Sequence, residues 1–273
     1  MTETEAATAS AGWSFVVPYY IEEAFLAATL ASLGAQSVRP LTLILVDNAS
    51  NDASPEIART FAAGVAGEGI DVSLVSEARP GQAFALEAGI ARANAPFTAI
   101  CDADTIYPPD YLARAEAMMR GDGAAAAIAF GVGRPDDFMG RLVRAKGRLA
   151  SFLMPRQAHG GGYAHAFRTE ILKSVGGYSR ERWPYCLKDH ELIHRVAKRG
   201  RLAYDFDHWC LASDRRSDRR RMTWTLAERL LYHLTPYGLK DWFFYEFLRA
   251  RFEARGLSEL RLRERDWEGA SGA

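Results

Sequence analysis

The stretch FTAICDADTIYPPDYL, residues 97–112, decides the fold, because an apolar run ends there in two aspartates separated by one residue. Side chains of a strand alternate between its two faces, so a strand through Asp102 and Asp104 would point both carboxylates the same way. Neighbouring carboxylates repel each other unless a proton, a cation or hydrogen-bond donors intervene. Open α/β sheets bind ligands at the ends of their strands, and we therefore expect a positively charged group at this pair.

The bulk composition indicates a globular protein. At 273 residues with 48% hydrophobic content, the chain is long enough for one large domain or two small ones with a real core. Its 34 basic and 34 acidic residues cancel, which gives no support for a nucleic-acid-binding surface. No run approaches the roughly 20 apolar residues of a membrane-spanning helix. We expect a cytoplasmic protein, or one peripheral on the inner membrane face.

The cysteines and the N-terminus fit the same compartment. Cys101, Cys186 and Cys210 are far apart and have no metal-ligand spacing, so we expect reduced cysteines in the core of a cytosolic protein. Residues 1–12, MTETEAATASAG, are acidic and lack an apolar core. They predict a disordered tail rather than a signal peptide.

The N-terminal half alternates short β-rich runs with helical stretches. Strands are predicted at 14–20, 41–47, 72–78, 97–102 and 124–133, and helices at 22–36, 54–66 and 81–94. Ser54 is the expected N-cap of the second helix, with Pro55 in its first turn. Strands that are apolar on both faces and alternate with helices indicate a Rossmann-like, mostly parallel sheet with helices on both faces.

The second half has a looser pattern. Residues 138–153 predict a basic helix, 159–178 a glycine-rich turn followed by a strand and a short helix, and 187–200 a helix ending at Gly200. We expect one compact domain over 13–212, and a basic loop with a C-terminal helical extension over 213–273.

The C-terminal extension is predicted to be two helices, broken near the TPYG of residues 235–238. Phe243, Phe244, Phe247 and Leu248 share one helical face. Such a face packs on its own domain or lies in a membrane interface, and the sequence leaves both alternatives open.

The acidic pair suits a divalent cation. Mg²⁺ and Mn²⁺ are hard cations that take one or two carboxylates together with waters and substrate phosphate oxygens. An isolated Asp-x-Asp is common by chance and is often a solvated turn. The position of Asp102 and Asp104 after three strand–helix units favours a metal site that accepts a nucleoside diphosphate.

An ordered series of blocks extends this interpretation: VVPYYIEE, LVDNASND, ARPGQAFALEAGIARA, ICDADTIYPPDYL, GGYAHAFRTEILKSVGGY and KDHEL. Over residues 14–200 the series resembles the family-two glycosyltransferases of the GT-A fold. The resemblance implies transfer of a sugar from a nucleoside-diphosphate sugar to an acceptor hydroxyl, with inversion and with Mn²⁺ or Mg²⁺. The Gln-x-x-Arg-Trp motif of processive synthases is missing, so a non-processive member is expected.

The resemblance also implies roles for individual residues. Asp189 in KDHEL falls at the position of the catalytic base, Asp104 at a direct metal ligand, and Asp102 facing the ribose or the metal. The remaining donor-site residues are Val17, Pro18 and Glu22 around the nucleoside, Asp47 and Asn48 beside the base, Arg79 and Gly81 along the base and ribose, and Gly161, Gly162, Phe167 and Arg168 at the sugar and acceptor.

Some positions depart from the family pattern. Asn48 replaces a second acid, and Lys188 replaces the acid that usually precedes the base. Tyr20 and Ala164 each stand at a position where the family commonly has asparagine. A lysine next to Asp189 is expected to lower the pKa of that carboxyl and keep it ionised.

Two further groups of side chains have open roles. The stretch SDRRSDRRRMTW, residues 213–224, offers Arg215, Arg216, Arg219 and Arg220 to the donor phosphates, or is a solvated basic loop. A third metal ligand is not assigned among His159, His165, His190 and His208.

Two other functions compete with this prediction. A sugar nucleotidyltransferase would place a glycine-rich basic loop after the first strand, where this chain has VPYYIEE. A non-catalytic nucleotide-sugar-binding relative or scaffold would be expected to lose the acidic pair or the base, and both are present. The expected partners are thus a nucleotide-sugar donor and a glycan or lipid-linked acceptor, with no nucleic acid.

Overall fold

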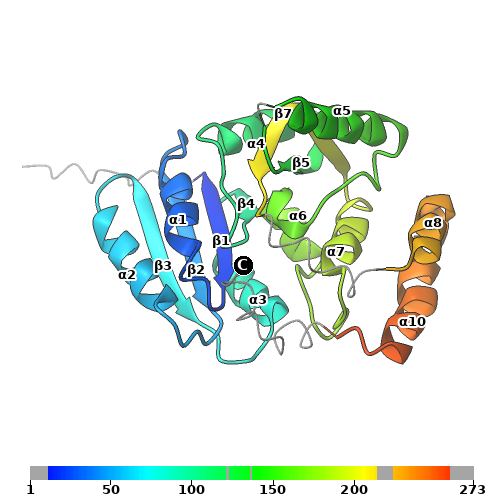
Figure 1. Ribbon diagram of the computed structural model, residues 1–273, viewed down its shortest axis with the longest axis horizontal. Helices are drawn as coiled ribbons and strands as arrows, with labels where there is room; N and C mark the ends of the chain where they lie inside the picture. The colour runs from blue at the N-terminus through cyan, green and yellow to red at the C-terminus, as the bar shows by residue number, and fades with distance from the viewer. Residues whose placement is uncertain (1–11, 121–122, 136, 214–223, 259–273) are drawn as a thin grey trace, which may run out of the picture.

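The computed structural model describes residues 12–120, 123–135, 137–213 and 224–258. Its centre is a seven-stranded sheet with the strand order β3-β2-β1-β4-β6-β5-β7 (Figure 1). Neighbouring strands are parallel except around β6, which runs antiparallel to β4 and β5. The strands are β1 (Trp13–Tyr19), β2 (Leu41–Asp47), β3 (Ile70–Ser76), β4 (Phe97–Ile100), β5 (Ala124–Val132), β6 (His165–Arg168) and β7 (Arg201–Leu211).

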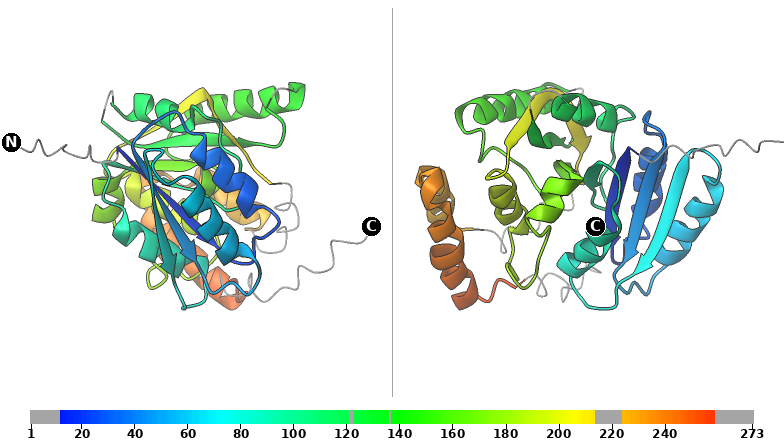
Figure 2. Two further views of the ribbon diagram at one scale, coloured as in Figure 1. Left: turned by 90° about the vertical axis from the view of Figure 1, so that its left-hand side faces the viewer. Right: turned by 180° about the vertical axis from the view of Figure 1, so that it is seen from behind.

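Helices cover both faces of this sheet, and the C-terminal helices α8 and α10 lie at the end of the molecule opposite β3 (Figures 1 and 2). The α-helices are α1 (Leu26–Gly34), α2 (Ser54–Gly64), α3 (Gln82–Arg92), α4 (Tyr111–Arg120), α5 (Phe138–Leu153), α6 (Thr169–Ser174), α7 (Lys188–Val196), α8 (Leu226–Leu234), α9 (Lys240–Trp242) and α10 (Arg249–Ala254). The described residues also contain 3-10 turns at Gly162–Ala164 and Tyr237–Leu239 and a π-helical segment at Phe243–Leu248.

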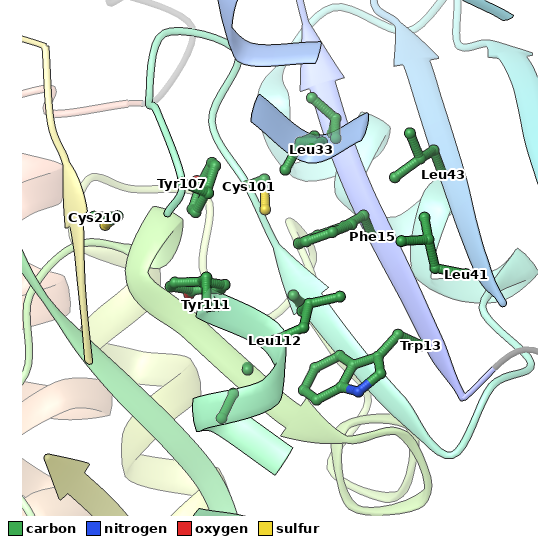
Figure 3. Packing of buried hydrophobic residues seen from close by; sticks show 14 of the residues in the cluster. Trp13, Phe15, Leu33, Leu41, Leu43, Cys101, Tyr107, Tyr111, Leu112 and Cys210 are labelled. Carbon is green, nitrogen blue, oxygen red and sulfur yellow. The ribbon is translucent and has the colours of Figure 1, made fainter. Parts of the chain in front are cut away.

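Two hydrophobic cores form because strand side chains alternate. Trp13, Phe15 and Val17 of β1 point into the first core, with α1 and α4, while Val16 points into the second, with α3, α6 and α7. Figure 3 shows the first core, where the Cys101 and Cys210 sulfurs lie among aromatic and leucine side chains. All three cysteines are buried and form no disulfide, as the sequence predicts.

The structure corrects several predicted boundaries. Strand β4 ends at Ile100 and not at Asp102, so the acidic pair lies in the turn after the strand and the alternation argument does not apply to it. Helix α2 begins with Ser54 itself, and Ala53 is the N-cap. The Ser54 hydroxyl instead accepts a 2.8 Å hydrogen bond from the Glu22 N–H, which ties the loop after β1 to α2. Helix α7 ends at Val196, four residues before Gly200.

Strand β7 and helix α4 were not predicted. In β7 the residues Leu202, Tyr204 and Cys210 are buried at even positions while Arg201, Asp205 and Asp207 are exposed at odd ones. This period-two pattern is a signal for a half-buried strand. The charged residues of β7 mask this alternation in the sequence, and the strand was therefore not predicted.

The aromatic face of the C-terminal segment packs on its own domain, which decides between the two alternatives above. Of the predicted face, Phe243, Phe244 and Leu248 are buried in a third cluster around Trp183, and Phe247 packs against this cluster while partly buried. These side chains are therefore not available to a lipid surface. Among the described residues, no helix has the length and apolar character needed to cross a membrane.

Candidate functional site

The acidic pair lies at the carboxyl edge of the parallel strands. Asp47 is the last residue of β2, and Asp102 follows two residues after the end of β4. Because parallel strands β2, β1 and β4 are adjacent, these ends meet at one edge of the sheet. Gln82, the first residue of α3, donates a 3.1 Å hydrogen bond to Asp102 Oδ1. Asp104 is 8% exposed and accepts from the Thr105 hydroxyl.

Asp189 is held from two directions by distant parts of the chain. The Tyr178 hydroxyl donates a 2.7 Å hydrogen bond to Asp189 Oδ1, and the Gly162 N–H donates to the same carboxylate. A Cβ on Gly162 would lie 2.4 Å from Asp189 Oδ1 and 2.5 Å from the Tyr178 hydroxyl oxygen. Only glycine leaves room for this arrangement.

The surroundings keep Asp189 ionised. Burial acts to raise its pKa, but the charge of Lys188 and the hydrogen bonds from the Tyr178 hydroxyl and the Gly162 N–H act against it, and the pKa lies below its ordinary value. Asp189 also stands in the first turn of α7, where the helix dipole favours a carboxylate. The lysine effect predicted from the sequence is thus present.

The charges of Asp102 and Asp189 both act on the Tyr178 hydroxyl. Burial raises the pKa of Tyr178 well above its ordinary value, and the charges of Asp189 and Asp102 raise it further. The strand end at β4, the start of α7 and the segment after α6 therefore converge. This convergence is what a two-substrate site requires.

Three histidines gather beside Asp189. The ring centroids of His159 and His190 are 4.4 Å apart, and those of His159 and His165 are 5.9 Å apart. Burial lowers the pKa of His165 and of His190 to about 4, so both rings are neutral near pH 7. Trp224 and Tyr232 pack on His190 from the C-terminal extension, which therefore forms one wall of this cluster.

Asn48 fixes a loop through its side-chain amide. Its Nδ2 donates to the carbonyls of Glu77 and Arg79 at 2.9 and 2.8 Å, and its Oδ1 accepts from the Gly81 N–H at 3.0 Å. Two of these three bonds need an N–H donor, which a carboxylate cannot supply. An asparagine side chain can therefore make all three hydrogen bonds to the segment before α3, and an ionised acid at this position cannot.

The other predicted donor-site residues lie around this edge with different exposures. Asp47 Oδ1 accepts from the Ser50 N–H at 3.0 Å, and Arg79 forms a 2.8 Å ion pair with Glu77. The Arg79 guanidinium also lies 4.2 Å from the Phe84 ring centroid. The side chain of Val17 faces the first core, so at this position only the backbone is available to a ligand.

Three non-glycine residues of the described chain have positive φ, and each lies beside the candidate site. They are Ile21 after β1, Ala49 after β2 and Leu187 before Asp189, with φ of 52°, 59° and 61°. This left-handed conformation costs L-residues about 1–2 kcal/mol. Such strain is concentrated at functional sites more often than elsewhere.

Two predicted residues lie away from the acidic pair. Arg168 pairs with Phe97 at the start of β4, the end remote from Asp102, because β6 runs antiparallel. Its Nε donates to the Ala124 carbonyl and its Nη2 to that of Met119, so this guanidinium joins β6 to β5 and α4. Phe167 is buried in the second core. The prediction that both shape the sugar and acceptor region is wrong. Arg215, Arg216, Arg219 and Arg220 lie outside the described residues.

The donor set at the acidic pair fits a shared metal. In the described part of the chain no cluster of three or more His, Cys, Asp or Glu side chains is arranged to hold an ion. The four histidines that the sequence offered therefore do not complete a protein cage with Asp102 and Asp104. Two carboxylates without a full cage match Mg²⁺ or Mn²⁺ when waters and substrate phosphates supply the other ligands.

Sequence reasoning assigned no role to Tyr178 or Gln82. Tyr178 follows Gly176 and Gly177, whose φ values of 83° and 53° make a turn that glycine adopts readily. The GGY signal was visible, but the direction of the tyrosine hydroxyl depends on tertiary structure. Gln82 had no signal beyond its place at the start of a helix.

Comparison with known proteins gives one family match. The family model described as Glycosyl transferase family 2 matches residues 14–175, more than half of the chain. No curated protein sequence matches the chain.

Several solved structures share the fold. A Pyrobaculum calidifontis mannosyltransferase, PcManGT, in complex with GDP-Man and Mn²⁺ superposes with a TM-score of 0.62 at 25% identity, over 77% of this chain and 60% of that one. The chain thus spans less than two thirds of that relative. S. aureus TarS 1–349 with UDP-GlcNAc gives 0.56 at 17% identity, covering 88% and 72%. Mycobacterium tuberculosis glucosyl-3-phosphoglycerate synthase with Mn²⁺, UDP and glucosyl-3-phosphoglycerate gives 0.55 at 21%, covering 84% and 81%.

Proposed function

The chain belongs to glycosyl transferase family 2, and from this premise we propose that it transfers a sugar from a nucleoside-diphosphate sugar to an acceptor hydroxyl. The observation that carries the proposal is that Tyr178 lies within the influence of both Asp189, to which it donates a hydrogen bond, and Asp102 of the acidic pair. The carboxylates of Asp102 and Asp104 suit a diphosphate with its cation, and the carboxylate of Asp189 suits the removal of a proton from the acceptor. The donor class is supported by PcManGT, whose structure contains GDP-Man and Mn²⁺.

Asp189 is the proposed general base. A sugar hydroxyl is a weak nucleophile, so a carboxylate must remove its proton as the new glycosidic bond forms. The lowered pKa of Asp189 ensures that the carboxylate is ionised near neutral pH, at some loss of basicity. A single displacement from the side of Asp189 would invert the anomeric centre.

Asp102 and Asp104 are the proposed holders of a divalent cation. When bound, Mn²⁺ or Mg²⁺ supplies Lewis-acid stabilisation of the negative charge on the leaving diphosphate. Gln82 orients Asp102 through its hydrogen bond, and the burial of Asp104 limits the freedom of the second carboxylate. These contacts hold both acids in place before a ligand arrives.

Asn48 and Arg79 are proposed to shape the nucleoside side of the site. Asn48 fixes the backbone of Glu77, Arg79 and Gly81, and Glu77 fixes the Arg79 guanidinium. The acceptor is proposed to be a glycan or a glycolipid precursor, as the family resemblance implies.

The proposal is tested by an assay of sugar transfer that is monitored by NMR. The protein is incubated with UDP-glucose, UDP-GlcNAc or GDP-mannose and Mn²⁺, with and without simple glycoside acceptors, and the anomeric signals are recorded. The proposal predicts release of nucleoside diphosphate from one donor, a product of inverted configuration, and loss of both in Asp189→Asn. A product of retained configuration would contradict the single displacement. Release that persists unchanged in Asp189→Asn would remove the base from its role.

A further inference from the structure

Helix α5 is amphipathic, but it exposes its apolar side and buries small and polar residues. Its buried positions are Gly140, Arg144 and Ser151, whose spacing of four and seven places them on one side. A Cβ on Gly147 would lie 2.6 Å from the Phe130 ring, so this glycine also faces β5. A helix that covers a sheet ordinarily buries its apolar stripe. Here small and polar residues face the protein instead.

The outward side of α5 bears the large apolar side chains. Phe138, Leu149 and Phe152 are 76%, 60% and 79% exposed, and Met139, Val143 and Leu153 are exposed as well. Figure 1 shows α5 along an outer edge of the molecule, with no other described helix or strand beyond it. A contiguous apolar face of this kind marks a surface that something else covers.

The charge of α5 points to what covers it. The helix has no acidic residue, although the whole chain has a formal net charge of zero. Arg141, Lys146 and Arg148 are exposed, and Arg156 follows in the next loop. Arg141 and Arg148 are one heptad apart, so both border the same edge of the apolar face. Their long stems can lie along apolar surface while the charges remain in water.

An anionic lipid surface matches both the apolar and the basic side chains of α5, whereas the α5 of a second copy supplies no opposite charge. Two copies paired through α5 would form an isologous contact in which each basic edge meets a helix that has no acidic residue. In a bilayer interface, acyl chains receive the apolar side chains and lipid phosphates receive the arginines and lysine. At 16 residues, α5 is too short to cross the hydrocarbon core.

We infer that α5 lies in the plane of an anionic membrane surface, with Phe138, Leu149 and Phe152 among the acyl chains and Arg141, Lys146 and Arg148 at the phosphates. The inference does not rest on the proposed function. It places the lipid contact on α5, which combines an exposed apolar side with a basic edge, and not on the aromatic face of the C-terminal helices, which is buried.

The connection from α5 to the site is direct. The helix ends at Leu153, and the segment that follows brings His159 against His190 and the Gly162 N–H against Asp189. A lipid-bound α5 would therefore hold this side of the candidate site near the membrane surface.

The test uses the full chain and vesicles of defined composition. Co-sedimentation is measured with phosphatidylcholine vesicles and with vesicles of equal parts phosphatidylcholine and phosphatidylglycerol. We expect binding to the anionic vesicles, weaker binding to the neutral ones, and a loss of the difference at high salt. No binding to either vesicle would overturn the inference.

Paired variants locate the contact. Leu149→Ser with Phe152→Ser should lower partitioning at least roughly tenfold. Arg141→Gln with Arg148→Gln should lower it about 25-fold on anionic vesicles alone, at about fivefold per residue. The matched control is Leu226→Ser with Leu230→Ser on α8, where both leucines are also exposed. Because all these side chains are exposed, we expect unchanged unfolding temperatures.

Two further outcomes would contradict the inference. Equal partitioning of the α5 variants and the wild type would exclude α5 as the contact, as would a loss seen only in the α8 control. If sedimentation instead showed a concentration-dependent dimer that the Leu149→Ser, Phe152→Ser variant abolishes, without vesicle binding, the face would be an interface between copies.

Discussion

The Tyr178 hydroxyl donates a 2.7 Å hydrogen bond to Asp189 Oδ1, across a gap in sequence that includes no regular helix or strand. Tyr178 follows a two-glycine turn after α6, and Asp189 is the second residue of α7. The contact therefore joins the ends of two helices at one carboxylate. Under the proposed mechanism, Tyr178 is a positioning residue that acts on the acceptor through Asp189.

Removing this hydroxyl tests the positioning role. Tyr178→Phe should lower kcat about tenfold, because a hydrogen bond to a charged group is worth about 1.5–3 kcal/mol. The hydroxyl lowers the pKa of Asp189, so its loss raises that pKa and moves the acid limb of the kcat/KM profile to higher pH. A purely structural role would change the rate without moving the limb. Tyr185→Phe, outside the site, is the matched control.

Neutralising the base should have a larger effect. Asp189→Asn keeps the size of the side chain but cannot accept the acceptor proton, so kcat should fall about 10²–10⁴-fold. Nucleotide affinity should be nearly unchanged, since Asp102 and Asp104 are intact. Steady-state kinetics alongside nucleotide titration separate the two effects. Asp71→Asn, exposed on β3, should behave as wild type. An Asp189→Asn enzyme of wild-type rate would rule out the proposed base.

The amide of Asn48 provides a stability prediction. Asn48→Asp would place a carboxylate against the carbonyls of Glu77 and Arg79 and remove two donated hydrogen bonds. We expect a loss of about 2–4 kcal/mol in the free energy of unfolding, measured by urea titration. Asn51→Asp, at an exposed position nearby, should stay within about 0.5 kcal/mol of wild type. Equal effects of the two substitutions would show that the amide contacts contribute nothing.

The positive φ of Ala49 predicts that an alanine-to-glycine substitution changes the free energy of unfolding in opposite directions at Ala49 and at a helical position. Ala49 is exposed at φ 59°, so Ala49→Gly should stabilise the protein by about 0.5–1 kcal/mol. Ala117 is exposed inside α4, where Ala117→Gly should destabilise it by about 1 kcal/mol. Thermal unfolding of both variants checks the pair. Destabilisation by Ala49→Gly would mean that the positive φ is not strained.

Much of the fold could be predicted from sequence because its signals are local. The β2 range was predicted residue for residue, and the basic helix over Phe138–Leu153 likewise. Where the prediction was wrong, tertiary contacts decided. Ser54 is bound to the loop after β1 instead of capping α2, and the strand before Asp102 stops two residues early.

Individual residues of the candidate site could be predicted from the sequence, but the hydrogen bonds between them could not. The acidic pair and Asp189 stood out by residue type and by family resemblance. The hydrogen bond of Tyr178 depends on how α6 and α7 pack, which no local pattern encodes. The role predicted for Arg168 was wrong for a related reason. Its sequence block fits the family motif, but β6 runs antiparallel to β4, so Arg168 lies opposite Phe97, at the end of β4 remote from Asp102.

We propose that Asp102 and Asp104 hold a cation which binds a nucleoside diphosphate, and calorimetric titration tests this proposal without an acceptor. UDP, GDP, dTDP and CDP are titrated into the wild-type protein and into Asp104→Asn, with Mn²⁺ and with EDTA. We expect that one diphosphate binds with Mn²⁺, and that EDTA or the substitution weakens this binding at least roughly tenfold. Nucleotide binding that is indifferent to both, or absent throughout, would contradict it and leave the acidic pair as a structural turn.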